Sequence, residues 1–124
     1  MSSSRGPIDL IHELFRRAPS YAAIRSDAEN DLVYEVFGDL ALLIVDKDPR
    51  LAREDVGAVF DLFNEMADSA HLEEQNVLVV AVLEVLCDRA SSRRFASRLL
   101  RGNGLALLER VSKGWPDEDS EKSR

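Results

Sequence analysis

The stretch EEQNVLVVAVLEVLCD, residues Glu73–Asp88, decides the fold of this chain. Its many β-branched residues favour a strand by propensity alone. However, no Gly, Pro or turn cluster interrupts the seventeen residues from Leu72 to Asp88, a length that is unusual for a strand and ordinary for a helix. Glu73 and Glu74 in the first turn, and Arg89 just past the end, complement a helix dipole. The stretch therefore predicts a buried central helix.

A single acidic residue, Glu84, lies near the end of this apolar run, and its position bears on whether the chain is an enzyme. On a helical wheel Glu84 falls with five other residues in one stripe about 120° wide, and the remaining positions are almost all Val, Leu or Ala. Its members are Glu73, Asn76, Val80, Glu84, Cys87 and Asp88. We therefore expect Glu84 to lie on a narrow solvent-exposed face, because unpaired buried carboxylates are rare.

Helix start and stop signals recur on both sides of the central segment, whereas strand signals do not. Proline, capping residues and glycine divide the chain into amphipathic segments. A short helical turn around Tyr21–Arg25 is compatible with the pattern. The other predicted helices are Pro7 to Arg17, Asp31 to about Val45, Pro49 to Asp68 with a break near Arg53, Leu72 to Asp88, Ser91 to Arg101, and Asn103 to Gly114.

These segments predict an all-α fold, a single compact bundle or short helical-pair stack of five to six helices around the central apolar helix. At 124 residues the chain has the length of one domain. We assign that domain to residues 1–115, and we expect residues 116–124 to form a disordered acidic and polar tail. The chain shows no secretory signal, and its longest apolar run, Val77–Leu83, is far shorter than the ~20 residues of a membrane span. We therefore expect a cytoplasmic protein that does not bind membranes.

Charge is unevenly distributed along the chain, whose net charge is −7. Residues 27–88 carry sixteen acidic and three basic side chains, and residues 89–113 carry seven basic and one acidic. Acidic residues recur at helical spacing, so like charges become neighbours and cost the helices stability. One explanation is solubility, with the arginines of residues 89–101 neutralising the acids. The other is an acidic surface that binds a basic partner.

We take the second explanation as the functional hypothesis. The three acidic stripes lie on the helices that begin near Asp31, near Pro49 and at Leu72. Tyr34 and Val80 are candidate apolar anchors beside them. The predicted partner-binding residues are Asp31, Glu35, Asp39, Asp61, Glu65, Asp68, Glu73, Val80, Glu84 and Asp88.

Catalytic and cofactor motifs are not found in the sequence. His12 and His71 have no metal-ligand spacing, and the single Cys87 lies in an apolar run where a buried side chain is expected. We therefore predict no cofactor, no metal site and no enzymatic activity. Arg94, Arg98 and Arg101 share one helical face, but the acidic bulk of the chain argues against direct binding of nucleic acid.

The segment from Asn76 through the apolar run to LEVLCD, residues 83–88, resembles the core of a group of small all-helical bacterial proteins, some of which are similar to immunity partners of secreted toxins. This resemblance implies a small cytoplasmic binding protein. The predicted function is therefore a non-catalytic protein-binding module, most concretely a bacterial immunity protein that neutralises a basic toxin through its acidic face. One alternative is a self-associating scaffold or regulatory adaptor, for example a homodimer. The other is a cation-dependent enzyme that uses clustered carboxylates such as Glu35, Glu65 and Glu84.

Overall fold

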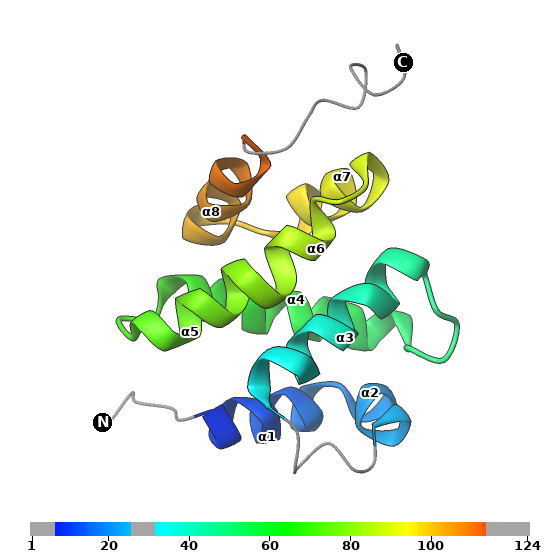
Figure 1. The fold of residues 1–124 in the computed structure, drawn as a ribbon. Helices are drawn as coiled ribbons and strands as arrows, with labels where there is room; N and C mark the ends of the chain where they lie inside the picture. The colour runs from blue at the N-terminus through cyan, green and yellow to red at the C-terminus, as the bar shows by residue number, and fades with distance from the viewer. Residues whose placement is uncertain (1–6, 26–31, 114–124) are drawn as a thin grey trace.

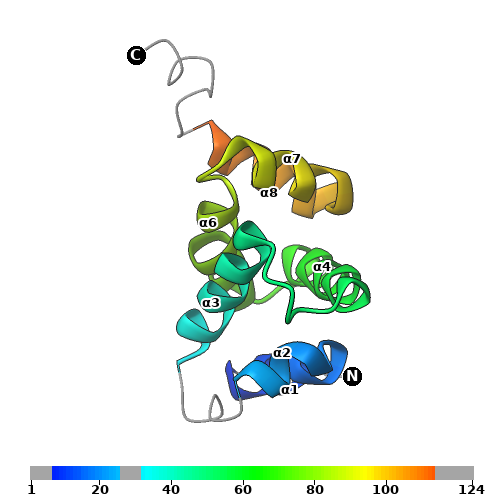
Figure 2. The same cartoon turned by 90° about the vertical axis from the view of Figure 1, so that its right-hand side faces the viewer.

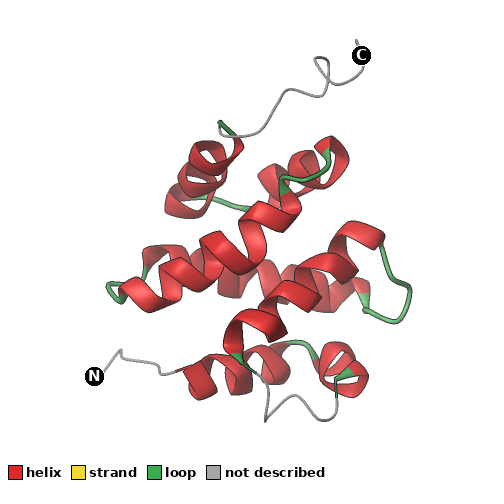
Figure 3. Ribbon diagram, viewed as in Figure 1, coloured by secondary structure: helices red, strands yellow, loops and turns green. Residues whose placement is uncertain are grey.

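A computed structural model describes residues 7–25 and 32–113, and its ordered elements in these ranges are all helical (Figures 1 and 3). The elements are α1 (Pro7–Arg17), α2 (Pro19–Ile24), α3 (Val33–Asp46), α4 (Arg53–Asp68), α5 (Leu72–Asn76), η2 (Val77–Leu83), α6 (Glu84–Leu86), α7 (Ala90–Leu99) and α8 (Gly102–Ser112). The all-α prediction is confirmed. Residues 116–124, predicted as a tail, lie outside the described residues.

The helix count was predicted slightly too low. Because α5, η2 and α6 follow one another without a break, the described ranges contain seven continuous helices rather than five or six. The additional helix is α2, which begins at Pro19, where proline's fixed φ angle suits the first helical turn. The predicted helical turn at Tyr21–Arg25 is therefore a complete short helix.

The central helix, α5–η2–α6, follows the prediction from Leu72 to Leu86. Its middle is π-helical: the Glu84 N–H donates to the carbonyl of Val79, five residues earlier. Asn76, Val80 and Glu84 are exposed, whereas most of the surrounding apolar residues are buried. Glu84 therefore lies on a narrow wet face, as expected. Cys87 falls in the polar stripe of an ideal wheel but is 1% exposed, which confirms the prediction that it is buried.

Helix α3 and the central helix form one layer and α4 forms another, whereas α1 with α2 and α7 with α8 lie at the two ends of the molecule (Figures 1 and 2). In Figure 1, α3 and α5–η2–α6 lie in front and α4 lies behind, and Figure 2 shows the same separation from the side. Helix α3 packs along η2 and α6, and α4 packs against α1, α5, η2 and α8. Gly38 faces the central helix, where an added Cβ would lie 3.7 Å from the carbonyl oxygen of Ala81.

Aromatic side chains connect the layers through the core. The Phe60 ring lies edge-on to Phe63 and to Phe95, with ring centroids 5.1 and 5.8 Å apart. Phe37 of α3 reaches the same cluster, 6.4 Å from Phe63. Edge-to-face aromatic pairs add to the stabilisation from burial alone. The cluster thereby fixes α3, α4 and α7 relative to one another.

Helix α4 begins at Arg53, where a break was predicted, and the part of the predicted segment from Pro49 to this break is not helical. Residues 48–52 instead form a turn, in which the Asp48 carboxylate accepts the Arg50 N–H at 2.9 Å. The Ser20 hydroxyl of α2 then accepts the Ala52 N–H at 2.9 Å and donates to Asp55 at 2.6 Å. This link satisfies a backbone donor at the start of α4, so contact with α2 sets where the helix begins.

The connection between α7 and α8 also differs from its prediction. Helix α7 ends at Leu99 rather than Arg101, and α8 begins at Gly102, which adopts a left-handed φ of +52°. Asn103, the predicted cap, lies inside the first turn of α8 and donates to Asp68 at 3.0 Å. The buried Asn64 of α4 supports the junction instead, because its amide accepts the Arg101 N–H at 2.9 Å and donates to the Leu99 carbonyl at 3.3 Å.

Candidate functional site

The predicted partner-binding residues separate into two groups on different layers of the molecule. Glu35 and Asp39 belong to α3, and four others belong to the central helix or its end. Asp61, Glu65 and Asp68 belong to α4, which lies in the other layer (Figure 2). Asp31 lies outside the described residues. The nine described residues are therefore divided between two layers.

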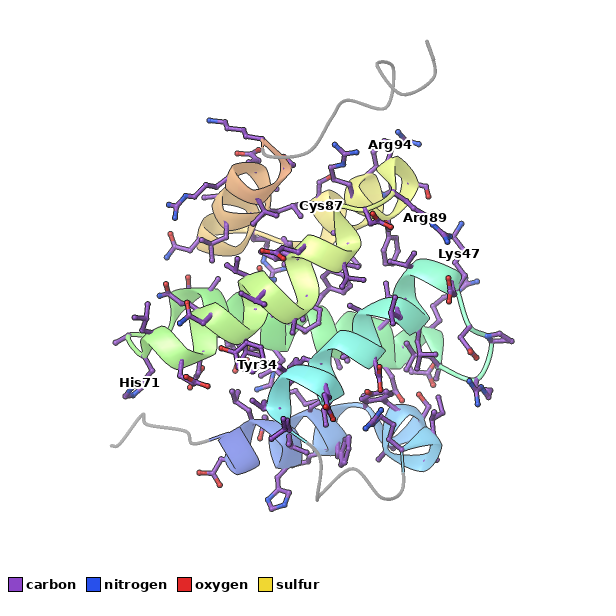
Figure 4. All side chains as sticks on the ribbon, viewed as in Figure 1. Tyr34, Lys47, His71, Cys87, Arg89 and Arg94 are labelled. Carbon is purple, nitrogen blue, oxygen red and sulfur yellow. The ribbon has the colours of Figure 1, made fainter. Side chains whose placement is uncertain are left out.

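The front layer presents exposed apolar and acidic residues together. Because α3 packs along η2 and α6, their outward sides form one surface, which we name the α3–α6 face. Three large apolar side chains on it are unusually exposed: Tyr34 by 36%, Leu42 by 50% and Val80 by 51%. Figure 4 shows Tyr34 between the start of α3 and the central helix. The face comprises Tyr34, Glu35, Leu42, Asn76, Val80 and Glu84, with Glu73 and Asp88 at its ends.

Four acidic residues of this face are available to a partner. Glu35, Glu73, Glu84 and Asp88 are exposed, and none forms an ion pair or side-chain hydrogen bond within residues 7–25 and 32–113. Asp39 differs, because its carboxylate pairs with Arg25. Exposed apolar groups beside unpaired charges are the elements of a protein-binding surface, in which buried anchors supply affinity and charges supply specificity.

The three predicted partner-binding acids of α4 are engaged within the molecule. Arg17 of α1 binds Glu65 through two parallel hydrogen bonds of 2.7 and 2.9 Å. Arg101 lies 3.5 Å from Asp61, and Asp68 accepts the hydrogen bond from Asn103. A two-pronged arginine–carboxylate contact is the strongest geometry for such a pair. These contacts join α1 and the start of α8 to α4. Of the arginines in residues 89–101 that were expected as one way of neutralising the acids, Arg101 pairs with Asp61, and Arg89 lies 3.9 Å from Asp46.

The contact between α1 and α4 extends into a small charged network. Glu13 binds Arg16 and also accepts a 2.6 Å hydrogen bond from Arg17. The hydrogen bond from Arg16 lowers the pKa of Glu13 to about 2, with Arg17 acting in the same direction against the effect of burial. In turn, the hydrogen bond to Glu65 raises the pKa of Arg17. Arg17 therefore links Glu13 of its own helix to Glu65 of α4.

The three carboxylates considered for a cation site belong to different layers of the molecule. In residues 7–25 and 32–113, no three His, Cys, Asp or Glu side chains gather as metal ligands would. Glu65, one of the three carboxylates considered for a cation, belongs to α4 and pairs with Arg17, whereas Glu35 and Glu84 belong to the α3–α6 face. Burial raises the pKa of the Cys87 thiol, which disfavours the reactive thiolate.

The arginines after the central helix do not form the single stripe predicted for them. Arg101 falls outside α7 and pairs with Asp61, whereas Arg94 and Arg98 line a cleft of about 870 Å³ between α7 and the connection from α3 to α4. The sequence pattern gives no sign of this cleft, because one wall comes from residues 43–57 and the other from residues 91–99. It also gives no sign that Glu74, in the first turn of α5, is fully buried.

Comparison with known proteins identifies no relative. No protein family, curated protein or solved structure matches this chain. Among the helices of the described residues, none combines the length and the apolar character needed to cross a bilayer.

Proposed function

We propose that this protein is a non-catalytic protein-binding module that binds a basic protein partner through the α3–α6 face. The observation that carries the proposal is the exposure of Tyr34, Leu42 and Val80 beside four acidic residues without ion pairs in the described ranges. Aromatic and aliphatic anchors surrounded by charge are typical of interface centres. The acidic charges match a basic partner and would speed its association.

The most concrete form of this function is toxin immunity. A nuclease or similar toxin needs a positive cleft for its phosphate-bearing substrate, and an acidic protein can occupy that cleft. The α3–α6 face offers exposed acidic groups on two helices, with Glu73 and Glu84 on the central helix and Asp88 just after its end. This arrangement supports an inhibitor that acts by coverage rather than by chemistry.

The test compares two charge-reversed variants of the full chain. Glu35→Lys with Glu84→Lys changes the α3–α6 face, and Glu54→Lys with Glu109→Lys makes the same charge change at exposed positions outside it. Each tagged protein is used for affinity purification from its native host at low and high salt. We expect one basic protein to be retained by the wild type and the control pair, and to be lost from the face variant.

Growth rescue then tests the immunity role directly. Co-expression of the wild type with the captured protein should restore growth if that protein is a toxin, and the face variant should restore it poorly. A partner retained equally by both variants would contradict the proposed surface. Capture of no partner, with a salt-sensitive dimer of the pure protein, would favour the self-associating scaffold instead.

A further inference from the structure

The cleft between α7 and the α3–α4 connection has an apolar floor. Leu43, Val56, Phe95 and Leu99 are only partly buried, and all four line it. Its volume of about 870 Å³ lies within the range of ligand-binding clefts. These side chains therefore expose apolar surface in a concave site, where an occupant would remove it from water.

The walls of the cleft carry four basic side chains. Lys47 and Arg53 come from the α3–α4 connection and the start of α4, and Arg94 and Arg98 lie one turn apart on α7. None of the four forms an ion pair with a residue in the described ranges. Figure 4 shows Lys47 and Arg94 at the same end of the molecule, together with Arg89.

The acidic side chain that lines the cleft is already paired with an arginine. Asp48 is the single acidic residue among those that line it, and its carboxylate is bound by Arg50 at 2.9 Å. The Arg98 guanidinium lies 5.9 Å from the centroid of the Phe95 ring, which holds this cation beside the floor. The site therefore presents positive charge around an apolar centre, although the whole chain has a net charge of −7.

The distribution of the cations indicates the kind of occupant. A small amphiphile with one anionic head would meet the cations of one wall, whereas charges on both walls require several separated anionic groups. An amphipathic helix supplies this pattern, with an apolar stripe facing the floor and acidic residues on both flanks.

From this charge and shape complementarity we infer that the cleft binds an acidic amphipathic helix of a partner protein, with Leu43, Val56, Phe95 and Leu99 against its apolar stripe and Lys47, Arg53, Arg94 and Arg98 beside its carboxylates. This site is separate from the α3–α6 face and does not depend on the function proposed for that face. The protein thereby has two binding surfaces of opposite charge.

The experiment uses a fluorescein-labelled synthetic peptide of about 14 residues, four helical turns, with Leu on one stripe and Glu on both flanks. Its binding to the full chain is measured by fluorescence anisotropy. Arg94→Glu with Arg98→Glu should weaken binding about tenfold or more, because it reverses both charges of one wall. The matched control is Arg110→Glu with Lys113→Glu, an equal charge change at exposed positions outside the cleft, and its affinity should stay within about twofold of the wild type.

Further arms separate the alternative occupants. A peptide with Lys in place of every Glu should not bind, and Glu35→Lys with Glu84→Lys should leave the affinity for the acidic peptide within about twofold of the wild type. Equal binding to the cleft variant and its control would overturn the inference. Binding of laurate with no binding of the peptide would overturn it in favour of a small anionic amphiphile. A wild-type dimer that dissociates in the cleft variant, with no peptide binding, would overturn it in favour of a second copy.

Discussion

Asn64 connects three helices through one buried side chain. Its amide satisfies the Leu99 carbonyl at the end of α7 and the Arg101 N–H before α8, two backbone groups at helix ends that the helices do not pair themselves. Gly104 makes this contact sterically feasible, because an added Cβ would lie 2.6 Å from the Asn64 Oδ1. The requirement for glycine therefore comes from a residue forty positions earlier in the chain.

We predict that Gly104→Ala lowers the free energy of unfolding by about 1–3 kcal/mol, because the methyl group displaces Asn64 from its hydrogen bonds. Gly57→Ala is the matched control, since Gly57 lies inside α4 with no atom within 4 Å of an added Cβ. The control should raise stability by about 0.5–1 kcal/mol. Urea unfolding followed by circular dichroism measures both, and equal effects would contradict this account of the junction.

The buried Tyr21 phenol makes the free energy of unfolding depend on pH in the alkaline range. Its phenol is fully buried and donates a 2.5 Å hydrogen bond to the Val36 carbonyl, and burial raises its pKa above the ordinary value of 10. Because the folded state holds the neutral phenol, its contribution is complete below pH 10 and is lost as the pH rises above 10.

We therefore predict that the free energy of unfolding falls above pH 10, with Tyr21 contributing up to about 1.4 kcal/mol per pH unit. Tyr21→Phe should remove this part of the slope. Tyr34→Phe, at the exposed second tyrosine of the chain, should not. Urea unfolding at pH 9, 10 and 11 compares the three proteins. An unchanged slope in Tyr21→Phe would show that the phenol ionises equally well in the folded chain.

At the scale of elements, the central helix was predictable because its signal is local. The uninterrupted apolar run from Val77 and the exposed position of Glu84 follow from composition and helical period. The start of α4 coincides with the predicted break near Arg53, but the non-helical turn before it was not predicted, because contact with the Ser20 hydroxyl of another helix supports it. Similarly, the start of α8 depends on Asn64. Boundaries that rest on tertiary hydrogen bonds leave no periodic pattern in the sequence.

Helix α3 ends in a conformation that its sequence does not favour. Lys47 follows the helix with φ +55° and ψ +45°, the left-handed region where glycine is usual. We predict that Lys47→Gly raises the free energy of unfolding by about 1 kcal/mol, because glycine adopts this conformation without steric cost. Lys113→Gly is the control: Lys113 ends α8 at φ −66°, so glycine there should give no gain. Thermal unfolding measures both variants, and a gain at both positions would contradict the backbone explanation.

At the scale of the whole molecule, the acidic surface was only half predictable from the sequence. Spacing along each helix correctly indicated that Glu35 and Glu84 are exposed. The same spacing also predicted Asp61 and Glu65 to be available to a partner. In the structure, however, Arg101 and Arg17 from other parts of the chain pair with them. Ion pairs between distant segments are invisible to a search at i+3 and i+4. The cleft was missed for the same reason, since its walls meet only in the folded chain.

Charge reversal should lower the free energy of unfolding more at Asp61 and Glu65 of α4 than at Glu35 and Glu84 of the α3–α6 face. Asp61→Arg with Glu65→Arg places cations beside Arg101 and Arg17, so we predict a loss of about 1 kcal/mol in the free energy of unfolding after allowing for solvent screening. Glu35→Arg with Glu84→Arg should change it by less than about 0.5 kcal/mol, because these exposed residues have no ion-pair partner among the described residues. Both variants change the net charge equally, so long-range effects are matched.

Urea unfolding at low and high salt measures the difference in the free energy of unfolding between the two variants, which should shrink as salt screens the repulsion. An equal loss in the two variants would show that Glu35 and Glu84 also stabilise the fold, and the α3–α6 face would then not be free to bind a partner.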